Sequence, residues 1–160
     1  MRSAYGAKEN EIGQHAATIV VDVANVMGSR PDGWWRDRAG AAVRLYTELT
    51  ALAASGRAIL PGEKGEQEFV MVLEGAARPA AARIAAARIA ADRIAAEGGA
   101  AGVQLVLAGG SGDDAIVDLA RELPGRRFVV TADRELQRRC VAAGAEILRP
   151  GWLISQLGKQ

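Results

Sequence analysis

The sequence contains very few of the side chains that bind soft metals or form cross-links. It has a single histidine, His15, and a single cysteine, Cys140. One thiol cannot form a disulfide within the chain, and this pair does not supply the ligands of a zinc site. We expect His15 on the surface and Cys140 in a structural role on a helix.

Long apolar runs and a dominant charge are also missing. No stretch reaches the roughly 18 apolar residues of a membrane helix. Residues 1–17 lack the apolar core of a signal peptide, so we expect a flexible N-terminal extension on a cytoplasmic protein. The formal net charge of +1 excludes little, because a basic patch can exist on a neutral protein. The remaining length, residues 18–157, suits a single domain with a substantial core.

Short apolar runs rich in β-branched residues predict strands. They are residues 18–23, 68–74, 103–108, 127–132 and 145–148. Helical patterns lie between them, at residues 37–55, 79–97, 113–125 and 133–144, with a last helical piece at 151–157. Gly144 follows the fourth helical pattern and predicts a left-handed C-terminal cap. Strands alternating with helices predict an α/β protein with a parallel sheet covered on both faces.

Residues 76–100 form an Ala/Arg-rich insertion in which Arg-Ile-Ala-Ala recurs every five residues. Five residues advance a helix by about 500°, so the isoleucines do not form one stripe. Alanine and Pro79 favour a helix that Gly98 and Gly99 end. Two interpretations remain open: a long crossover helix, or an arm that contacts RNA or a partner subunit.

Polar residues follow the ends of several predicted strands. They are Asp22 and Asn25 after the first, Glu74 after the second, Asp113, Asp114 and Asp118 after the third, and Thr131 and Asp133 after the fourth. The carboxyl ends of parallel strands meet at one edge, where open α/β sheets bind ligands. Clustered carboxylates repel one another unless a cation lies between them, and oxygen ligands suit Mg²⁺ or Mn²⁺.

Each acid also has a structural explanation. Asp113 and Asp133 are suited to cap helices, Asp114 suits a first turn, and Asp118 suits a solvated surface. Asp22 directly continues an apolar run and is poorly placed to cap a helix. This favours a functional role for Asp22.

The ordered set Asp22-x-x-Asn25, GSGDDAIVDLA (110–120) and VVTADRELQRRCVAAGAEIL (129–148) resembles the PIN/NYN ribonuclease superfamily, most closely its YacP-like NYN branch. The resemblance covers roughly residues 18–150 apart from the Ala/Arg-rich insertion. It implies a three-layer α/β sandwich with a parallel, PIN-like (Rossmannoid) sheet of about five strands. It also implies an endoribonuclease that uses Mg²⁺ or Mn²⁺ to hydrolyse RNA.

Carried over by residue, the resemblance implies that Asp22, Asp114 and Asp133 are catalytic metal ligands. Asp113 is a close substitute for Asp114 as a ligand. Asn25, Asp118 and Thr131 are implied to contact the ligands without binding the metal themselves. Many PIN domains carry a further acid between the second and third strands, where this chain offers only Glu74 and Asp92. This departure puts a two-metal site in doubt.

The loop GSRPDGWWRDR (28–38) leaves the same edge as Asp22. Its candidate RNA-binding residues are Arg30, Trp34, Trp35, Arg36 and Arg38, since tryptophan stacks on unpaired bases and arginine binds phosphates. The alternative is that one tryptophan packs the first helix onto the sheet. Trp152 is expected to be a packing residue.

Three functions fit these residues. The first is a metal-dependent endoribonuclease acting on RNA, including structured or ribosome-associated RNA. The second is a nucleotide phosphohydrolase, although the haloacid-dehalogenase, Nudix and P-loop signatures are missing. The third is a catalytically weak RNA-binding protein. A homo-oligomer is compatible with all three, and no membrane partner is expected.

Overall fold

The structure of the protein is a computed structural model that describes residues 17–63, 67–94 and 102–158. Its strands are β1 (Ala17–Asp22), β2 (Gln67–Leu73), β3 (Val103–Leu107), β4 (Arg127–Val130) and β5 (Glu146–Leu148). They form a five-stranded sheet in the order β3-β2-β1-β4-β5, and every neighbouring pair is parallel. The predicted parallel sheet is therefore confirmed.

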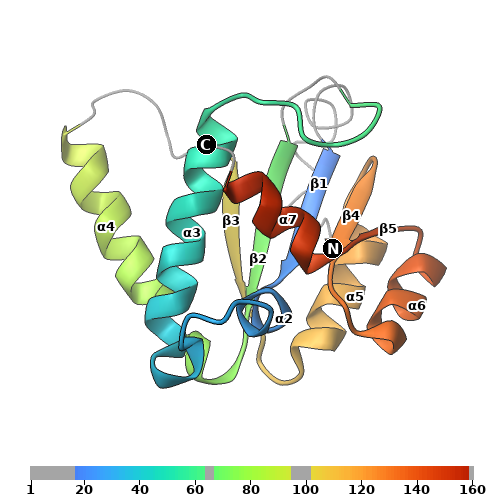
Figure 1. Ribbon diagram of the computed structural model, residues 1–160, viewed down its shortest axis with the longest axis horizontal. Helices are drawn as coiled ribbons and strands as arrows, with labels where there is room; N and C mark the ends of the chain where they lie inside the picture. The colour runs from blue at the N-terminus through green and yellow to red at the C-terminus, as the bar shows by residue number, and fades with distance from the viewer. Residues whose placement is uncertain (1–16, 64–66, 95–101, 159–160) are drawn as a thin grey trace, which may run out of the picture.

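Helices cover both faces of this sheet (Figure 1). They are α2 (Val23–Gly28), α3 (Arg38–Ala54), α4 (Ala80–Ile94), α5 (Gly112–Glu122), α6 (Arg134–Ala142) and α7 (Pro150–Leu157), with 3-10 turns η2 (Trp34–Arg36) and η3 (Gly75–Ala77). Helices α3 and α7 cross in front of the strands in Figure 1, whereas α5 lies behind them. This arrangement confirms the expected three-layer α/β sandwich.

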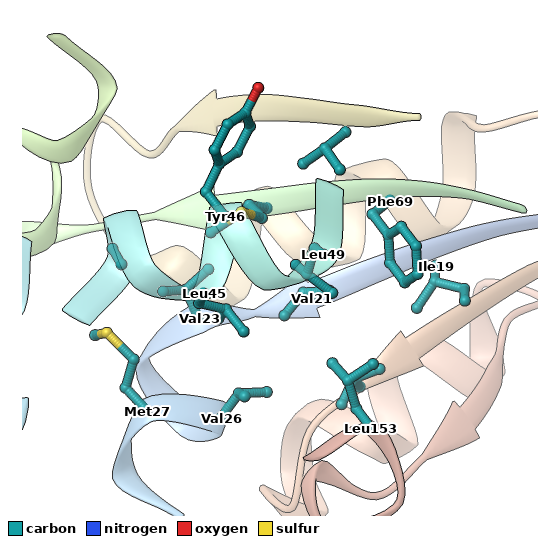
Figure 2. Packing of buried hydrophobic residues seen from close by; sticks show 14 of the residues in the cluster. Ile19, Val21, Val23, Val26, Met27, Leu45, Tyr46, Leu49, Phe69 and Leu153 are labelled. Atoms are coloured by element: carbon teal, nitrogen blue, oxygen red, sulfur yellow. The ribbon is translucent and has the colours of Figure 1, made fainter. Parts of the chain in front are cut away.

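Two apolar clusters follow from the pleat of the strands. Ile19 and Val21 of β1 pack with Leu45 of α3 in the larger cluster, which Figure 2 shows from close by. Val20, between them in sequence, packs with Ile116 of α5 in the cluster on the opposite face. Because both faces are covered, β1 is buried along its whole length and has no polar alternation.

Helix α4 packs one side against the larger cluster. Ala80 and Ile84 are buried there, while Arg83 is exposed. The side chains of Ile89, Asp92 and Ile94, and the proposed stop at Gly98 and Gly99, lie outside the described residues. His15 and nearly all of the predicted N-terminal extension lie outside them too.

Two features of the chain paths matter for function. The strand order reverses at β1, which pairs with β2 on one side and with β4 on the other. The short helix α2, which the sequence analysis did not predict, starts directly where β1 ends. Within the described part of the chain, no helix is long and apolar enough to cross a membrane.

A candidate acidic site at the carboxyl edge of the sheet

Asp22 lies at the point where the strand order reverses. Val21 of β1 is paired with Val130 of β4, so the next residues, Asp22 and Thr131, leave their strands side by side. The Thr131 hydroxyl donates a hydrogen bond to Asp22 Oδ2 at 2.9 Å, and both side chains are buried. This contact joins the ends of two strands at the place where ligands bind in open α/β sheets.

Asp22 also caps a helix. Its Oδ1 accepts a hydrogen bond from the backbone N–H of Asn25 at 3.3 Å, which makes it the N-cap of α2. The prediction that Asp22 is poorly placed for a cap is therefore wrong. The predicted strand ran to residue 23, whereas α2 begins at Val23. A cap uses one carboxylate oxygen and leaves acceptor capacity on the other.

Asn25 and Thr131 hold the loop after β4 in place. Asn25 Oδ1 accepts from the backbone N–H of Ala132 at 2.9 Å, and Thr131 Oγ1 accepts from the N–H of Asp133 at 3.2 Å. Asp133 in turn caps α6, its Oδ1 accepting from the N–H of Leu136 at 3.1 Å. Asn25 and Thr131 therefore both bind the backbone of the loop that carries the predicted ligand Asp133.

Glu74 follows β2 and reaches the start of α5. Its Oε2 accepts a hydrogen bond from the backbone N–H of Gly112 at 2.7 Å. A Cβ atom at position 112 would lie only 2.6 Å from that oxygen, so the contact requires a glycine there. Glu74 thus brings a second strand-end acid to the edge, placed against the positive end of a helix.

The two neighbouring aspartates of α5 have different surroundings. Asp113 is partly buried, and burial followed by the charges of Asp133 and Glu74 raises its pKa. Asp114 is exposed and its Oδ1 binds Arg139 of α6 at 2.8 Å. The N-cap of α5 is Ser111, so Asp113 is not a cap. The geometry favours Asp113 over Asp114 as the member of the acidic edge.

Asp118 lies farther out. Its side chain is 65% exposed and 3.8 Å from Arg121. Asp114 and Asp118 are four residues apart and so share one side of α5. Both side chains are exposed, which corresponds to the solvated interpretation of Asp118.

The ionisation of Asp22 is perturbed by burial and, to a smaller extent, by the neighbouring acids. The pKa of Asp22 rises from 3.8 to about 6, chiefly because of burial. The hydrogen bonds from Thr131 and Asn25 lower this pKa, while the charges of Asp113 and Glu74 raise it. A buried carboxyl group with like charges around it, at the edge where ligands bind, is characteristic of functional sites.

The predicted RNA-contacting loop is partly engaged in internal contacts. The two terminal guanidinium nitrogens of Arg30, Nη1 and Nη2, donate to the Glu48 carboxylate at 2.6 and 2.8 Å. Trp34 packs against the larger apolar cluster with the Arg38 guanidinium 5.1 Å from its ring centroid. Trp35 is 57% exposed. This is the arrangement of the packing alternative, in which one tryptophan is fixed and the other lies on the surface.

Two other expectations concern single residues. Gly144 follows α6 with a φ of 99°, as a left-handed cap requires. Cys140 is buried in α6, and burial raises the pKa of its thiol to about 11. A thiol with this pKa is protonated at neutral pH and is a poor nucleophile.

The sequence analysis underrated Glu74. Its role depends on Gly112, which lies 38 residues away along the chain. A local signal existed, because Glu74 directly follows an apolar strand as Asp22 does. The rule that selected Asp22 also placed Glu74 among the strand-end residues, but it did not predict the contact with Gly112.

The class of protein follows from comparison with known families. Residues 38–150, more than half of the chain, match the family described as PIN like domain, and the chain belongs to this family. Among solved structures, the chain is similar to Rae1 (YacP) from Bacillus subtilis, determined as its W164L mutant. The two share 16% identity with a TM-score of 0.58 over 89% of this chain and 76% of the other. No curated protein sequence matches the chain.

Proposed function

We propose that the protein is a metal-dependent endoribonuclease whose active site is the acidic edge. The observation that carries this proposal is the buried Asp22 carboxyl, whose pKa is raised to about 6 with Asp113 and Glu74 contributing. Membership of the PIN-like family and the likeness in fold to Rae1 support it. RNA is then the substrate, and the cytoplasm the expected location.

The donor set fits a hard divalent cation, Mg²⁺ or Mn²⁺. In the described part of the chain, no three acidic, histidine or cysteine side chains stand close enough together to form a ready-made metal site. Mg²⁺ commonly binds through one or two carboxylates and keeps several of its waters, so it does not require three protein ligands around one point. Asp22, Asp113 and Asp133 are the acids that would hold the ion, and Glu74 would support them.

The bound ion would supply an activated water and stabilise charge on the phosphodiester. The protein's own residues have simpler roles. Thr131 and Asn25 keep Asp22 and the loop before Asp133 in register through the hydrogen bonds already described. Glu74 fixes the start of α5 and thereby the position of Asp113.

The test is cleavage of a labelled oligoribonucleotide in Mn²⁺, Mg²⁺ or EDTA by the parent protein and by Asp22→Asn and Asp133→Asn. Asparagine caps helices as well as aspartate does, so both variants should fold. Each should lose cleavage by at least roughly 100-fold, as expected when electrostatic stabilisation is removed. Equal cleavage by parent and variants would refute the assignment.

A second candidate is an RNA-binding protein with little or no catalytic activity. The observation that favours it is the lack of a ready-made ligand set among the described residues. Calorimetric titration with Mn²⁺ separates the two candidates. The ribonuclease should bind Mn²⁺ and lose that binding in Asp22→Asn, whereas the binding protein should take up RNA equally with and without metal.

A further inference from the structure

A cavity of about 590 Å³ lies beside the acidic edge, between the end of α2 and the facing parts of α6 and α7. Its lining includes Ser29, Ala132, Arg134, Gln137, Arg149 and Trp152. The volume falls in the range of roughly 300–1,000 Å³ that small-molecule sites occupy. None of these six residues belongs to the acidic edge, so the cavity is a separate feature of the surface.

The cavity and the acidic edge share a loop. Ala132 lines the cavity, while its backbone N–H binds Asn25 and its neighbour Asp133 is one of the edge acids. Gln137 lines the cavity as well, and its Nε2 donates to the backbone carbonyl of Thr131 at 2.8 Å. A ligand in the cavity would therefore lie next to the carboxylates without displacing them.

The charged groups of the cavity are cationic. Arg134 and Arg149 both line it, and among the described residues neither forms an ion pair, in contrast to Arg139, which binds Asp114. The first turn of α7 also lines it, with Pro150 at the helix start. Its partial positive charge adds to that of the arginines. A phosphate group fits this arrangement, because one guanidinium group can donate hydrogen bonds to two phosphate oxygens at once.

The remaining side chains suit a base. Trp152 is partly buried and packs against the larger apolar cluster, so its ring is held in place where it meets the cavity. Rings of this kind stack on unpaired bases. The Gln137 amide is fixed through its nitrogen by Thr131, which leaves its oxygen to accept a hydrogen bond from a base.

We propose that this cavity binds one nucleotide of single-stranded RNA, with its phosphate on Arg134 and Arg149 and its base on Trp152 and Gln137. The proposal rests on the proposed function only in placing that nucleotide next to the bond to be cleaved. The two arginines also offset the repulsion that the acidic edge would exert on a polyanion. The sequence analysis assigned RNA contact to loop 28–38 and packing to Trp152. The cavity shares Ser29 with that loop but none of the five residues predicted to bind RNA.

The test measures RNA affinity by fluorescence anisotropy, with a labelled single-stranded oligoribonucleotide and the full chain in EDTA. Arg134→Gln and Arg149→Gln should each weaken binding by roughly 10-fold, as expected for loss of a charge-assisted contact. Each should also reduce the salt slope by about 0.7, the value for one phosphate on a single strand. Arg138→Gln, on the same helix but outside the cavity lining, is the matched control and should change affinity by less than about 2-fold.

The base is tested separately. Trp152→Phe should keep most of the affinity, whereas Trp152→Ala should lower it by roughly 10-fold through lost stacking. Circular dichroism checks that both variants fold. Trp152→Phe keeps an aromatic ring that can both pack and stack, so it remains informative if the alanine variant does not fold. Adenosine monophosphate should displace the RNA at concentrations at which inorganic phosphate does not.

Several results would overturn the proposal. They are undetectable RNA binding by the parent, unchanged affinity in the Arg134/Arg149 double variant, and equal weakening by Arg138→Gln. Equal displacement by phosphate and by adenosine monophosphate would overturn the assignment of a nucleotide. The proposed function fails on a different measurement. A parent protein that binds RNA through these arginines but never cleaves it with Mn²⁺ would support the nucleotide site and refute the ribonuclease activity.

Discussion

Charged side chains are arranged differently at the two ends of the sheet. At the amino end opposite charges are paired, and at the carboxyl end like charges lie near one another. At the amino end, Arg126 binds Glu146 through two hydrogen bonds, at 2.6 and 3.0 Å, and also binds Glu63 at 2.9 Å. Arg126 lowers the pKa of Glu146. At the carboxyl end, burial raises the pKa of Asp22, and the charges of its neighbours Asp113 and Glu74 raise it further. Matched charges stabilise a fold, whereas like charges brought together point to a ligand.

The sharpest test of this contrast lies within one helix. Asp113 belongs to the like-charged edge, whereas its neighbour Asp114 is matched by Arg139. We expect Asp113→Asn to lower metal-dependent cleavage by roughly 100-fold and Asp114→Asn by less than about 3-fold, because only the first removes charge from the edge. Kinetics of oligoribonucleotide cleavage in Mn²⁺ measures both. The reverse order would restore Asp114 as the ligand that the family resemblance implied.

The second prediction concerns stability and pH in the metal-free protein. The folded pKa of Asp22 lies above its ordinary value, so the folded state binds the proton more tightly, and ionisation of Asp22 destabilises it. This penalty is absent below about pH 4, grows as the pH rises and is complete above about pH 6. It amounts to about 3 kcal/mol, since the pKa rises by about two units and each unit is worth about 1.4 kcal/mol.

Asp22→Asn should remove that penalty while keeping the cap of α2. Urea unfolding in EDTA should show the variant gaining on the parent between about pH 3 and about pH 8 by about 3 kcal/mol. Ionisation of Glu146 has the opposite effect on stability. Its pKa is lowered in the folded protein, so the stability that it contributes is lost as the pH falls. A constant difference between parent and Asp22→Asn at all pH values would mean that the Asp22 carboxyl is not perturbed.

The third prediction concerns Glu74. Glu74→Gln can still accept the hydrogen bond from Gly112, but it removes one negative charge from the edge. We expect cleavage to fall by roughly 10-fold, the lower end of the effect of removing a group that supports a metal site. Mn²⁺ titration should show a matching loss of affinity. Unchanged kinetics and metal affinity would exclude Glu74 from the site.

The smallest effect is expected at the amino end. Glu146→Gln breaks the exposed pair with Arg126, which is worth little in water. Cleavage should be unchanged, and thermal unfolding should show a slightly lower Tm in low salt that approaches the parent's in high salt. A clear loss of cleavage would mean that the two ends of the sheet are coupled and that the contrast between them is too simple.

Much of the edge was predictable from local signals, but not which acid faces which. Asp22 and Asp133 follow apolar runs, and parallel strands bring such residues to one edge. Asp113 and Asp114 are adjacent, and consecutive residues point about 100° apart on a helix. Only the packing of α5 shows that Asp113 faces the edge and that Asp114 faces Arg139. The helix α2 was not predicted, because six residues are too few to show the spacing of apolar residues that is typical of a helix.

The sequence by itself determined the five strands, their parallel direction and the acidic residues that follow them, because these depend on side-chain type along short stretches of chain. Only the tertiary structure decided that Glu74 reaches Gly112, and that Arg134, Arg149 and Trp152 line one cavity. These contacts join segments far apart in sequence. Whether such segments meet depends on how helices pack on the sheet, which no local pattern of residues encodes.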